Sequence, residues 1–136
     1  MMGTVYAEIT LKNAVDVVNA QRGVIGEAQI RTATVNAMVD TGAGTLVINE
    51  ELRQRLGLEV RRLLEVTLAD NTKAVCKRVE PVEVHWKDRE MSCQPLVVSE
   101  GEVLLGLIPL EDMDLMVDPT RQQLTGAHGE KILSRI

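Results

Sequence analysis

The sequence predicts an all-β protein with one or two short helices. Over most of the chain, apolar residues alternate with polar ones in short segments, which is the period of a strand with one buried face. Turn-forming residues separate these segments. Only residues 49–57 and 108–113 carry helix features instead. The chain has 136 residues and is 45% hydrophobic, so we expect one domain, residues 1–136, with a core of its own.

Composition limits the partners. The net charge is −5, which disfavours nucleic acid, because phosphate binding needs a basic surface. Lys and Arg cluster within residues 53–62 and 73–78, and we interpret both clusters as solvated faces rather than as a patch that attracts substrate. Cys76 and Cys93 form neither a Cys-x-x-Cys pair nor a cluster with histidine, so we expect reduced thiols, no metal and no cofactor.

The N-terminus has no features of a targeting segment. It lacks a basic region followed by a long apolar core, and no apolar run in the chain is long enough to span a bilayer. We therefore expect a cytoplasmic protein that does not bind membranes.

The chain before residue 40 is expected to form strands. Residues 3–12 alternate in hydropathy, and the valines within residues 15–18 predict a second strand. Residues 26–31 and 32–39 predict one long strand or two bent ones. In the latter segment, the face of small and β-branched residues is expected to point into the core.

Residues 49–56 carry the clearest helix signal. Asn49 can cap the N-terminus, acidic residues occupy the first turn, and Gly57 can end the helix. Leu52 and Leu56 lie one turn apart and would form the buried stripe.

Two hairpins are expected to follow. Residues 64–79 predict one with its turn at Asp70 and Asn71, and residues 82–98 predict another with its turn at residues 87–90.

The C-terminal part predicts three more elements. They are a short strand over residues 103–106, a helix over residues 108–113, and a hairpin of residues 115–117 and 122–125. Residues 127–136 are polar and end apolar, which fits either a tail or a strand at a dimer interface. His85 and His128 have no partner at the spacing of a metal site or a catalytic triad, so His85 is interpreted as solvated and His128 as a loop residue.

Residues 34–48 contain the clearest functional signal. An apolar strand leads to a single carboxylate, Asp40, then to a tight turn of small residues and a second apolar strand. A charge held between buried strands is costly unless it is paired or protonated. A functional role for Asp40 is therefore the first hypothesis.

Residues 39–43, Val-Asp-Thr-Gly-Ala, resemble the active-site motif of the retropepsin-like aspartic proteases. These include the retroviral proteases, the DNA-damage-inducible retroviral-like proteases and small bacterial relatives. A second family element, two apolar residues and a glycine, is present as Leu104-Leu105-Gly106. The resemblance covers residues 26–124 and implies the closed, barrel-like acid-protease fold, as one half of a two-fold symmetric dimer.

The resemblance implies an aspartic endopeptidase with Asp40, Thr41 and Gly42 as catalytic residues. Two carboxylates within a hydrogen bond of each other share one proton: the ionised one activates water and the protonated one polarises the scissile carbonyl. The chain has only one Asp-Thr-Gly, so the second acid must come from Asp40 of a second copy. Thr41 would brace the two loops, and Gly42 would let the peptide backbone approach.

The family also implies which residues bind the peptide. They are Ala43, Gly44, Leu105 and the tip of the first hairpin, Ala69, Asp70, Asn71 and Thr72. Retroviral flaps have a glycine-rich tip, whereas this one is charged, so we expect a stiffer flap. Ala43 replaces the serine of pepsin-type enzymes, which predicts a less acidic pH optimum than that of pepsin.

Two alternatives to the enzyme remain. One is a non-catalytic dimeric module that binds peptides or proteins with the same fold. The other is a structural β-domain in which Asp40 caps its own loop through the amides of Thr41 and Gly42.

Overall fold

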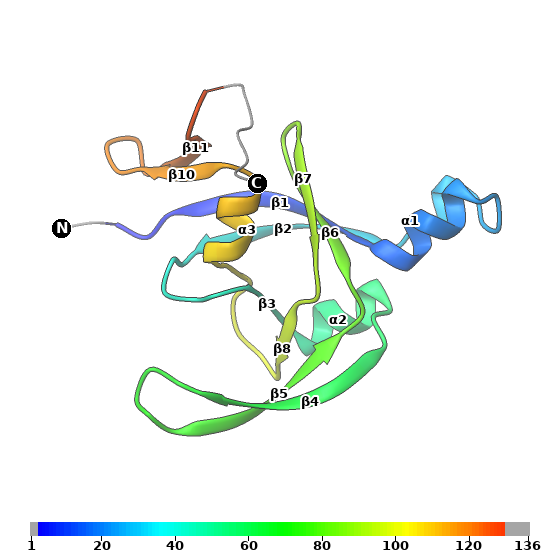
Figure 1. The fold of residues 1–136 in the computed structure, drawn as a ribbon, viewed down its shortest axis with the longest axis horizontal. Coiled ribbons are helices and arrows are strands. Elements are labelled where there is room, and N and C mark those ends of the chain that lie inside the picture. The colour runs from blue at the N-terminus through cyan, green and yellow to red at the C-terminus, as the bar shows by residue number, and fades with distance from the viewer. Residues whose placement is uncertain (1–2, 130–136) are drawn as a thin grey trace.

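The structure, a computed structural model, describes residues 3–129 and is mostly β (Figure 1). The strands are β1 (Tyr6–Asn13), β2 (Thr32–Val39), β3 (Leu46–Asn49), β4 (Val60–Thr67), β5 (Lys73–Val79), β6 (Val82–Trp86), β7 (Arg89–Cys93), β8 (Leu96–Val98), β9 (Leu104–Leu105), β10 (Leu115–Asp118) and β11 (Gln123–Gly126). The helices are α1 (Ala14–Gln21), α2 (Glu50–Leu56), α3 (Leu107–Asp112) and the 3₁₀ helix η1 (Glu27–Gln29).

One curled sheet organises the fold. It has nine strands in the order β4-β5-β8-β3-β9-β2-β1-β6-β7, and β10 and β11 form a separate pair. The mostly β fold class is confirmed, with two differences. Within residues 3–129 the sheet has edges at β4 and β7 and is a curled half-barrel rather than a closed one, and the α-helices number three rather than one or two.

The core is aliphatic, as expected from a sequence without phenylalanine. It lies inside the curl of the sheet and includes fully buried side chains from β1, β3, α2 and β9: Leu11, Leu46, Ile48, Leu56 and Leu105. The expected inner face of β2 is confirmed, with Ala33 and Ala37 buried.

The strand predicted at residues 15–18 is wrong, because this segment belongs to α1. The side chain of Asn13 caps the helix by accepting a hydrogen bond from the amide of Asp16 at 3.0 Å. The same side chain donates to the carbonyl of Leu56 at 2.9 Å, which holds the cap against α2. A helix cap fixed from outside the segment overrides the strand preference of its valines.

The strand predicted over residues 26–31 is also wrong. Residues 27–29 form η1, where the side chain of Gln29 accepts a hydrogen bond from the amide of Gly26 at 2.7 Å, and β2 begins only at Thr32.

The helix predicted at residues 49–56 is confirmed as α2. Asn49 accepts a hydrogen bond from the amide of Leu52 at 2.9 Å, and Gly57 ends the helix with φ = 64°. Leu52 and Leu56 are buried, as the one-turn spacing predicted.

The first predicted hairpin is confirmed as β4–β5, and the second is shorter than expected. β6 pairs with β7, which ends at Cys93. Pro95 has no amide hydrogen to continue the ladder. The chain then forms β8, which pairs in parallel with β3 and antiparallel with β5.

The C-terminal elements follow the prediction closely. β9 is the expected short strand, α3 begins one residue earlier than predicted, and β10 pairs with β11. Most of the tail over residues 127–136 lies outside the described residues. Among the described helices, none has the length and apolar character needed to cross a membrane.

Candidate active site

Asp40 lies in the loop between β2 and β3, and β9 passes between these two strands. β9 pairs in parallel with β2, Val39 opposite Leu105, and antiparallel with β3, Leu46 opposite Leu105. The amide of Asp40 continues the ladder by donating to the carbonyl of Leu105 at 3.0 Å. The glycine-ended strand therefore lies beside the motif loop, as the resemblance implied.

The loop is fastened to the start of α3. The amide of Leu107 donates to the carbonyl of Ala43 at 2.8 Å, and the amide of Ile108 donates to the carbonyl of Gly44 at 3.1 Å. Gly106 lies under this contact: a Cβ there would come within 2.2 Å of the Thr45 carbonyl oxygen. A side chain at Gly106 is therefore incompatible with the loop.

The carboxylate of Asp40 is half-buried, and its two oxygens have different environments. Oδ1 accepts a hydrogen bond from the amide of Gly42 at 2.9 Å. Oδ2 accepts none from any residue within 3–129. One oxygen thus holds the turn, while the other remains available to a water or a substrate.

A pocket of about 500 Å³ opens beside this carboxylate. Its apolar walls are Val5, Met38, Val39, Val117 and Pro119, and its polar groups include Thr4, Asp40, Thr41 and Gln122. The walls come from the chain before β1, the end of β2 and the β10–β11 hairpin. Sequence reasoning missed the parts from β10–β11 and the chain before β1, because neither carries a local functional motif.

The predicted site residues fall into three groups. Asp40, Thr41, Gly42, Ala43 and Gly44 share one loop, and Thr41, Gly42 and Gly44 are exposed. Leu105 was predicted to bind substrate, but its side chain is fully buried in the core. Its contribution to the loop is the backbone carbonyl that accepts from Asp40.

The third group is the tip of the β4–β5 hairpin, residues 69–72, all of which are exposed. Asp70 caps the turn by accepting from the amide of Thr72 at 3.0 Å and from its hydroxyl, and these bonds lower the pKa of Asp70. Asn71 has φ = 67°, the left-handed conformation expected of a residue that replaces a tip glycine. None of the tip residues lines the pocket beside Asp40.

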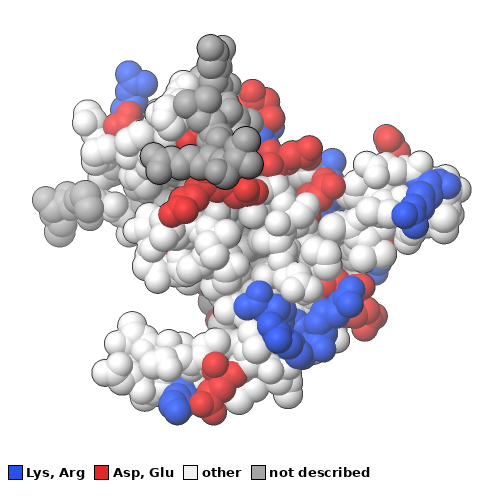
Figure 2. All heavy atoms as spheres, viewed as in Figure 1, with Lys and Arg blue, Asp and Glu red and all other residues white. Residues whose placement is uncertain are grey.

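The hairpin stands away from the body of the molecule, and Figure 2 shows a hollow between them near the hairpin's tip. In the view of Figure 1, the tip and the β2–β3 loop point to the same side. Lys and Arg gather over α2 and the adjoining part of the hairpin (Figure 2). The two basic clusters of the sequence adjoin each other in the hairpin, because Arg62 on β4 pairs directly with Arg78 on β5.

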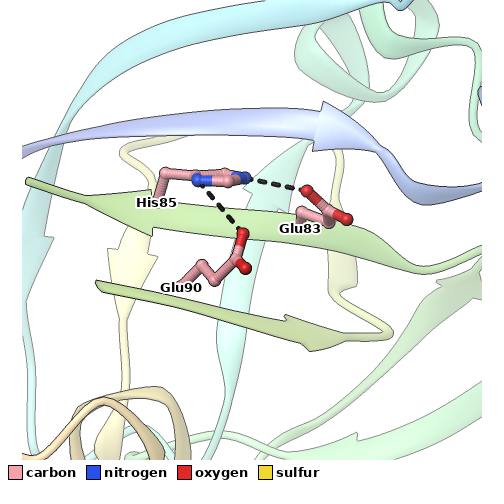
Figure 3. A group of neighbouring side chains, drawn as sticks. All are labelled: Glu83, His85 and Glu90. Atoms are coloured by element: carbon pink, nitrogen blue, oxygen red, sulfur yellow. Dashed lines mark hydrogen bonds and ion pairs between the residues drawn. The ribbon is translucent and has the colours of Figure 1, made fainter. Parts of the chain in front are cut away.

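Both histidines have carboxylate partners that sequence reasoning missed. His85 Nε2 lies 2.8 Å from a Glu83 oxygen and Nδ1 lies 3.5 Å from a Glu90 oxygen (Figure 3). His128 Nδ1 lies 2.8 Å from Asp114. The period of a strand places Glu83 and His85 on one face, a signal that could have revealed the first pair.

Glu83, His85 and Glu90 are the residues within 3–129 that come close enough together to hold a metal ion. The two carboxylates lie against opposite nitrogens of the ring (Figure 3). An ion bound at one nitrogen would leave the other carboxylate as a hydrogen-bond partner of the ring. This group belongs to the β6–β7 hairpin and shares no residue with the Asp40 pocket.

Comparison with known proteins supports the assignment of the motif. The family model described as "gag-polyprotein putative aspartyl protease" matches residues 26–112. No curated protein matches the sequence. The retroviral protease-like domain of Ddi1 from Leishmania major has a similar fold, with a TM-score of 0.56 and 17% identity over 92% of this chain and 89% of that one.

Two further solved structures are similar. The EIAV protease complexed with the inhibitor HBY-793 has a TM-score of 0.48 and 18% identity, over 98% of this chain and 94% of that one. A retropepsin-like aspartic protease from Rickettsia conorii has a TM-score of 0.46 and 20% identity, over 87% of this chain and 90% of that one.

Proposed function

The chain belongs to the gag-polyprotein aspartyl protease family, and from this premise we propose that it is an aspartic endopeptidase that works as a homodimer. The observation that carries the proposal is the state of Asp40. Its Oδ1 holds the turn through Gly42, its Oδ2 has no partner among residues 3–129, and an apolar pocket opens beside it. A carboxylate that only capped its loop would not need that pocket.

Catalysis requires a second carboxylate within hydrogen-bond distance of the first. The chain has only one Asp-Thr-Gly, so in the proposed dimer Asp40 of each copy supplies one acid. Two carboxylates this close share a proton, because both cannot ionise together. The ionised one takes a proton from water, which attacks the scissile carbonyl, and the protonated one hydrogen-bonds the carbonyl oxygen.

The pocket suggests the substrate. Val5, Met38, Val39, Val117 and Pro119 would favour an apolar side chain next to the scissile bond. The β4–β5 hairpin would cover the peptide from the other side, with Asn71 giving the tip the backbone conformation that glycine gives elsewhere. The cytoplasmic location inferred from the sequence remains part of this proposal.

One observation favours a second candidate function, that of a non-catalytic dimeric module that binds peptides. The hydrogen bond from Gly42 to Asp40 is the contact that a purely structural aspartate would make. A dimer that kept the fold but bound peptides without cleaving them would retain it too.

The test is cleavage of a mixed peptide library between pH 4 and pH 8 by the wild type and by Asp40→Asn. Asparagine keeps an oxygen that can accept from Gly42, so the loop should survive while the charge is lost. Asp88→Asn is the matched control, because Asp88 is an exposed turn residue of β6–β7. Light scattering gives the molar mass of each variant.

We expect cleavage by a dimer, undiminished in Asp88→Asn and lost in Asp40→Asn. A dimer that binds peptides without cleaving them would replace the enzyme with the binding module. Equal cleavage by Asp40→Asn and the wild type would overturn the mechanism.

A further inference from the structure

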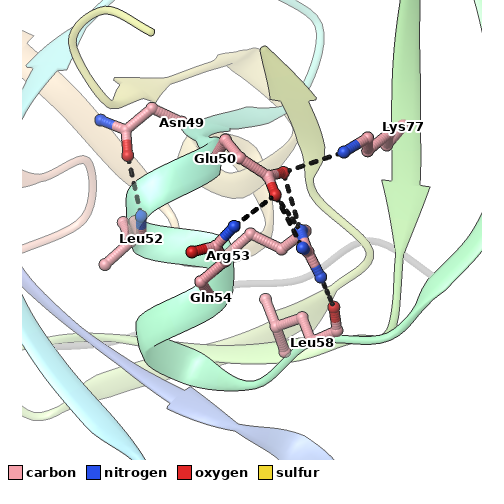
Figure 4. A network of polar contacts seen from close by, with 7 residues as sticks. All are labelled: Asn49, Glu50, Leu52, Arg53, Gln54, Leu58 and Lys77. Atoms are coloured by element: carbon pink, nitrogen blue, oxygen red, sulfur yellow. Dashed lines mark hydrogen bonds and ion pairs between the residues drawn. The ribbon is translucent and has the colours of Figure 1, made fainter. Parts of the chain in front are cut away.

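We propose that Glu50 is a positioning residue that sets the angle of the β4–β5 hairpin relative to the Asp40 loop. The inference rests on the proposed function, since it gives the hairpin the task of covering the peptide. Side-chain contacts join the hairpin to α2, the helix that follows the motif loop and β3 (Figure 4).

Glu50 is the first residue of α2, and its carboxylate holds three side chains. Arg53 donates to its two oxygens, with Nε at 2.8 Å from Oε1 and Nη2 at 2.7 Å from Oε2. Lys77 Nζ lies 3.1 Å from Oε1, and Gln54 Nε2 donates to Oε2 at 3.1 Å. The bonds from Arg53, followed by those from Lys77 and Gln54, lower the pKa of Glu50 to about 2. The Glu50 carboxylate is therefore charged throughout the pH range of the assays.

These contacts reach both ends of the hairpin. Lys77 belongs to β5. Arg53 Nη1 donates to the carbonyl of Leu58 at 2.8 Å, two residues before β4 begins at Val60. Glu50 thus links the entry and the exit of the hairpin to one point.

Glu50 is close in sequence to the motif loop that carries Asp40. β3, Leu46–Asn49, is the only element between the motif loop and Glu50, and it is held between β8 and β9. A central strand of four residues is a short and stiff connection. The position of the carboxylate is therefore set by the same strand that leaves the Asp40 loop.

The other ion pairs of the hairpin, within residues 3–129, join it only to itself or to the residue that follows it. Lys73 lies 3.4 Å from Glu65 across the two strands, and Arg61 lies 3.8 Å from Glu80. Glu50 differs because its partners come from two separate elements. It can therefore affect how the hairpin is placed, whereas Glu65 can affect only how the two strands pair.

Loss of the carboxylate would leave two cations facing each other. Arg53 and Lys77 both point at Glu50 (Figure 4), and without it their repulsion would favour a shift of β5 away from α2. A pocket of about 210 Å³ lies at this contact and is lined by residues that include Glu50, Val75 and Lys77. The space beside Lys77 would leave room for such a shift.

The experiment compares Glu50→Gln with the matched control Glu65→Gln, an exposed hairpin acid whose partner is also a lysine. For the best peptide found in the library, we expect KM to rise about tenfold in Glu50→Gln with kcat changed less than about twofold. Hydrogen exchange of the β5 amides should accelerate by a similar factor, while exchange in β1 and β2 stays unchanged. Glu65→Gln should leave all of these values within about twofold of the wild type.

A second variant tests the cause. Adding Lys77→Met to Glu50→Gln removes one of the two opposed cations, so it should lower the raised KM part of the way back to the wild-type value and slow the β5 exchange again. If neither KM nor the β5 exchange recovers, the explanation by repulsion between Arg53 and Lys77 is overturned.

Failure of this inference can be told apart from failure of the proposed function. If the wild type cleaves nothing, the peptidase proposal fails, but hydrogen exchange still reports how firmly the hairpin is held. Faster exchange confined to β4 and β5 in Glu50→Gln would support the positioning role. Faster exchange throughout the sheet, or a lower Tm with KM and hairpin exchange unchanged, would overturn it and leave Glu50 with a merely structural role.

Discussion

Gly106 lies directly against Thr45, so that a Cβ at Gly106 would come within 2.2 Å of the Thr45 carbonyl oxygen and 2.6 Å of the Ala43 carbonyl oxygen. Backbone atoms cannot yield as a flexible side chain can. The close approach brings α3 near enough for Leu107 and Ile108 to donate hydrogen bonds to Ala43 and Gly44. Gly106 therefore supports the loop that carries Asp40.

Gly106→Ala should destabilise the protein and displace this loop. We expect the unfolding free energy to fall by about 1–3 kcal/mol, the usual cost of forcing extra volume into a packed site. We also expect loss of peptide cleavage. Urea unfolding and the library assay measure the two effects. Gly44→Ala is the control, because nothing lies within 4 Å of a Cβ there. Equal stability of the two variants would show that the loop can adjust around Gly106.

The helices α1 and α2 differ in the range of the contacts that define them. α2 was predicted correctly because its signals are local: Asn49 caps it and Gly57 ends it within a few residues. α1 was missed because its cap, Asn13, is held by Leu56. Nothing near the valines of α1 reveals a partner so far along the chain.

The same contrast applies to the site. Asp40 and Gly106 could be found because each belongs to a short motif. The pocket walls could not, since Val5 and Val117 are brought to Asp40 by strand pairing and by the C-terminal hairpin. The buried side chain of Leu105 was misjudged because a motif shows which segment lies near the site, not which way each side chain points.

Asp16 should contribute stability that depends on pH. Its carboxylate is largely buried and accepts hydrogen bonds from Arg31 Nε at 2.9 Å, Nη2 at 3.0 Å and the amide at 3.0 Å. The side-chain bonds of Arg31, more than its charge, lower the pKa of Asp16 below the ordinary value of 3.8. A carboxylate whose pKa is lower in the folded state than in the unfolded state stabilises the protein at pH values above its unfolded-state pKa. This stability is lost as the pH falls through the folded-state pKa.

Asp16→Asn should therefore cost about 1–3 kcal/mol at pH 7, because it breaks a largely buried pair whose arginine is half exposed. Between about pH 4 and pH 2 its unfolding free energy should fall less steeply than that of the wild type. Urea unfolding at several pH values measures both effects. The control is Glu100→Gln at an exposed acid, which should follow the wild type. Parallel curves for wild type and Asp16→Asn would contradict the role of this pair.

Asn71 should be replaceable by glycine but not by a β-branched residue. Its φ of 67° is tolerated by asparagine, free for glycine and costly for valine. Asn71→Gly should change the unfolding free energy by less than about 0.5 kcal/mol, since relief of backbone strain is offset by a more flexible unfolded chain. Asn71→Val should lose about 1–2 kcal/mol. Thermal unfolding distinguishes the two, and similar Tm values would mean that the tip adopts another turn.

Arg62 should destabilise the hairpin, because it pairs directly with Arg78. Like charges opposite each other on neighbouring strands repel. Arg78 is half-buried, and its Nε finds no hydrogen-bond partner within residues 3–129. Arg62 is exposed, so substituting it disturbs no core contact.

Arg62→Glu would turn this pair into an attractive one and should raise the unfolding free energy by about 0.5–1 kcal/mol at low salt. The gain should shrink in about 1 M salt, where charges are screened beyond about 3 Å. Arg62→Thr removes the repulsion without adding attraction, so it should lie between the wild type and Arg62→Glu. Urea unfolding at both salt concentrations gives the comparison. A gain that persists in high salt would attribute the effect to strand preference rather than to the charge of Arg78.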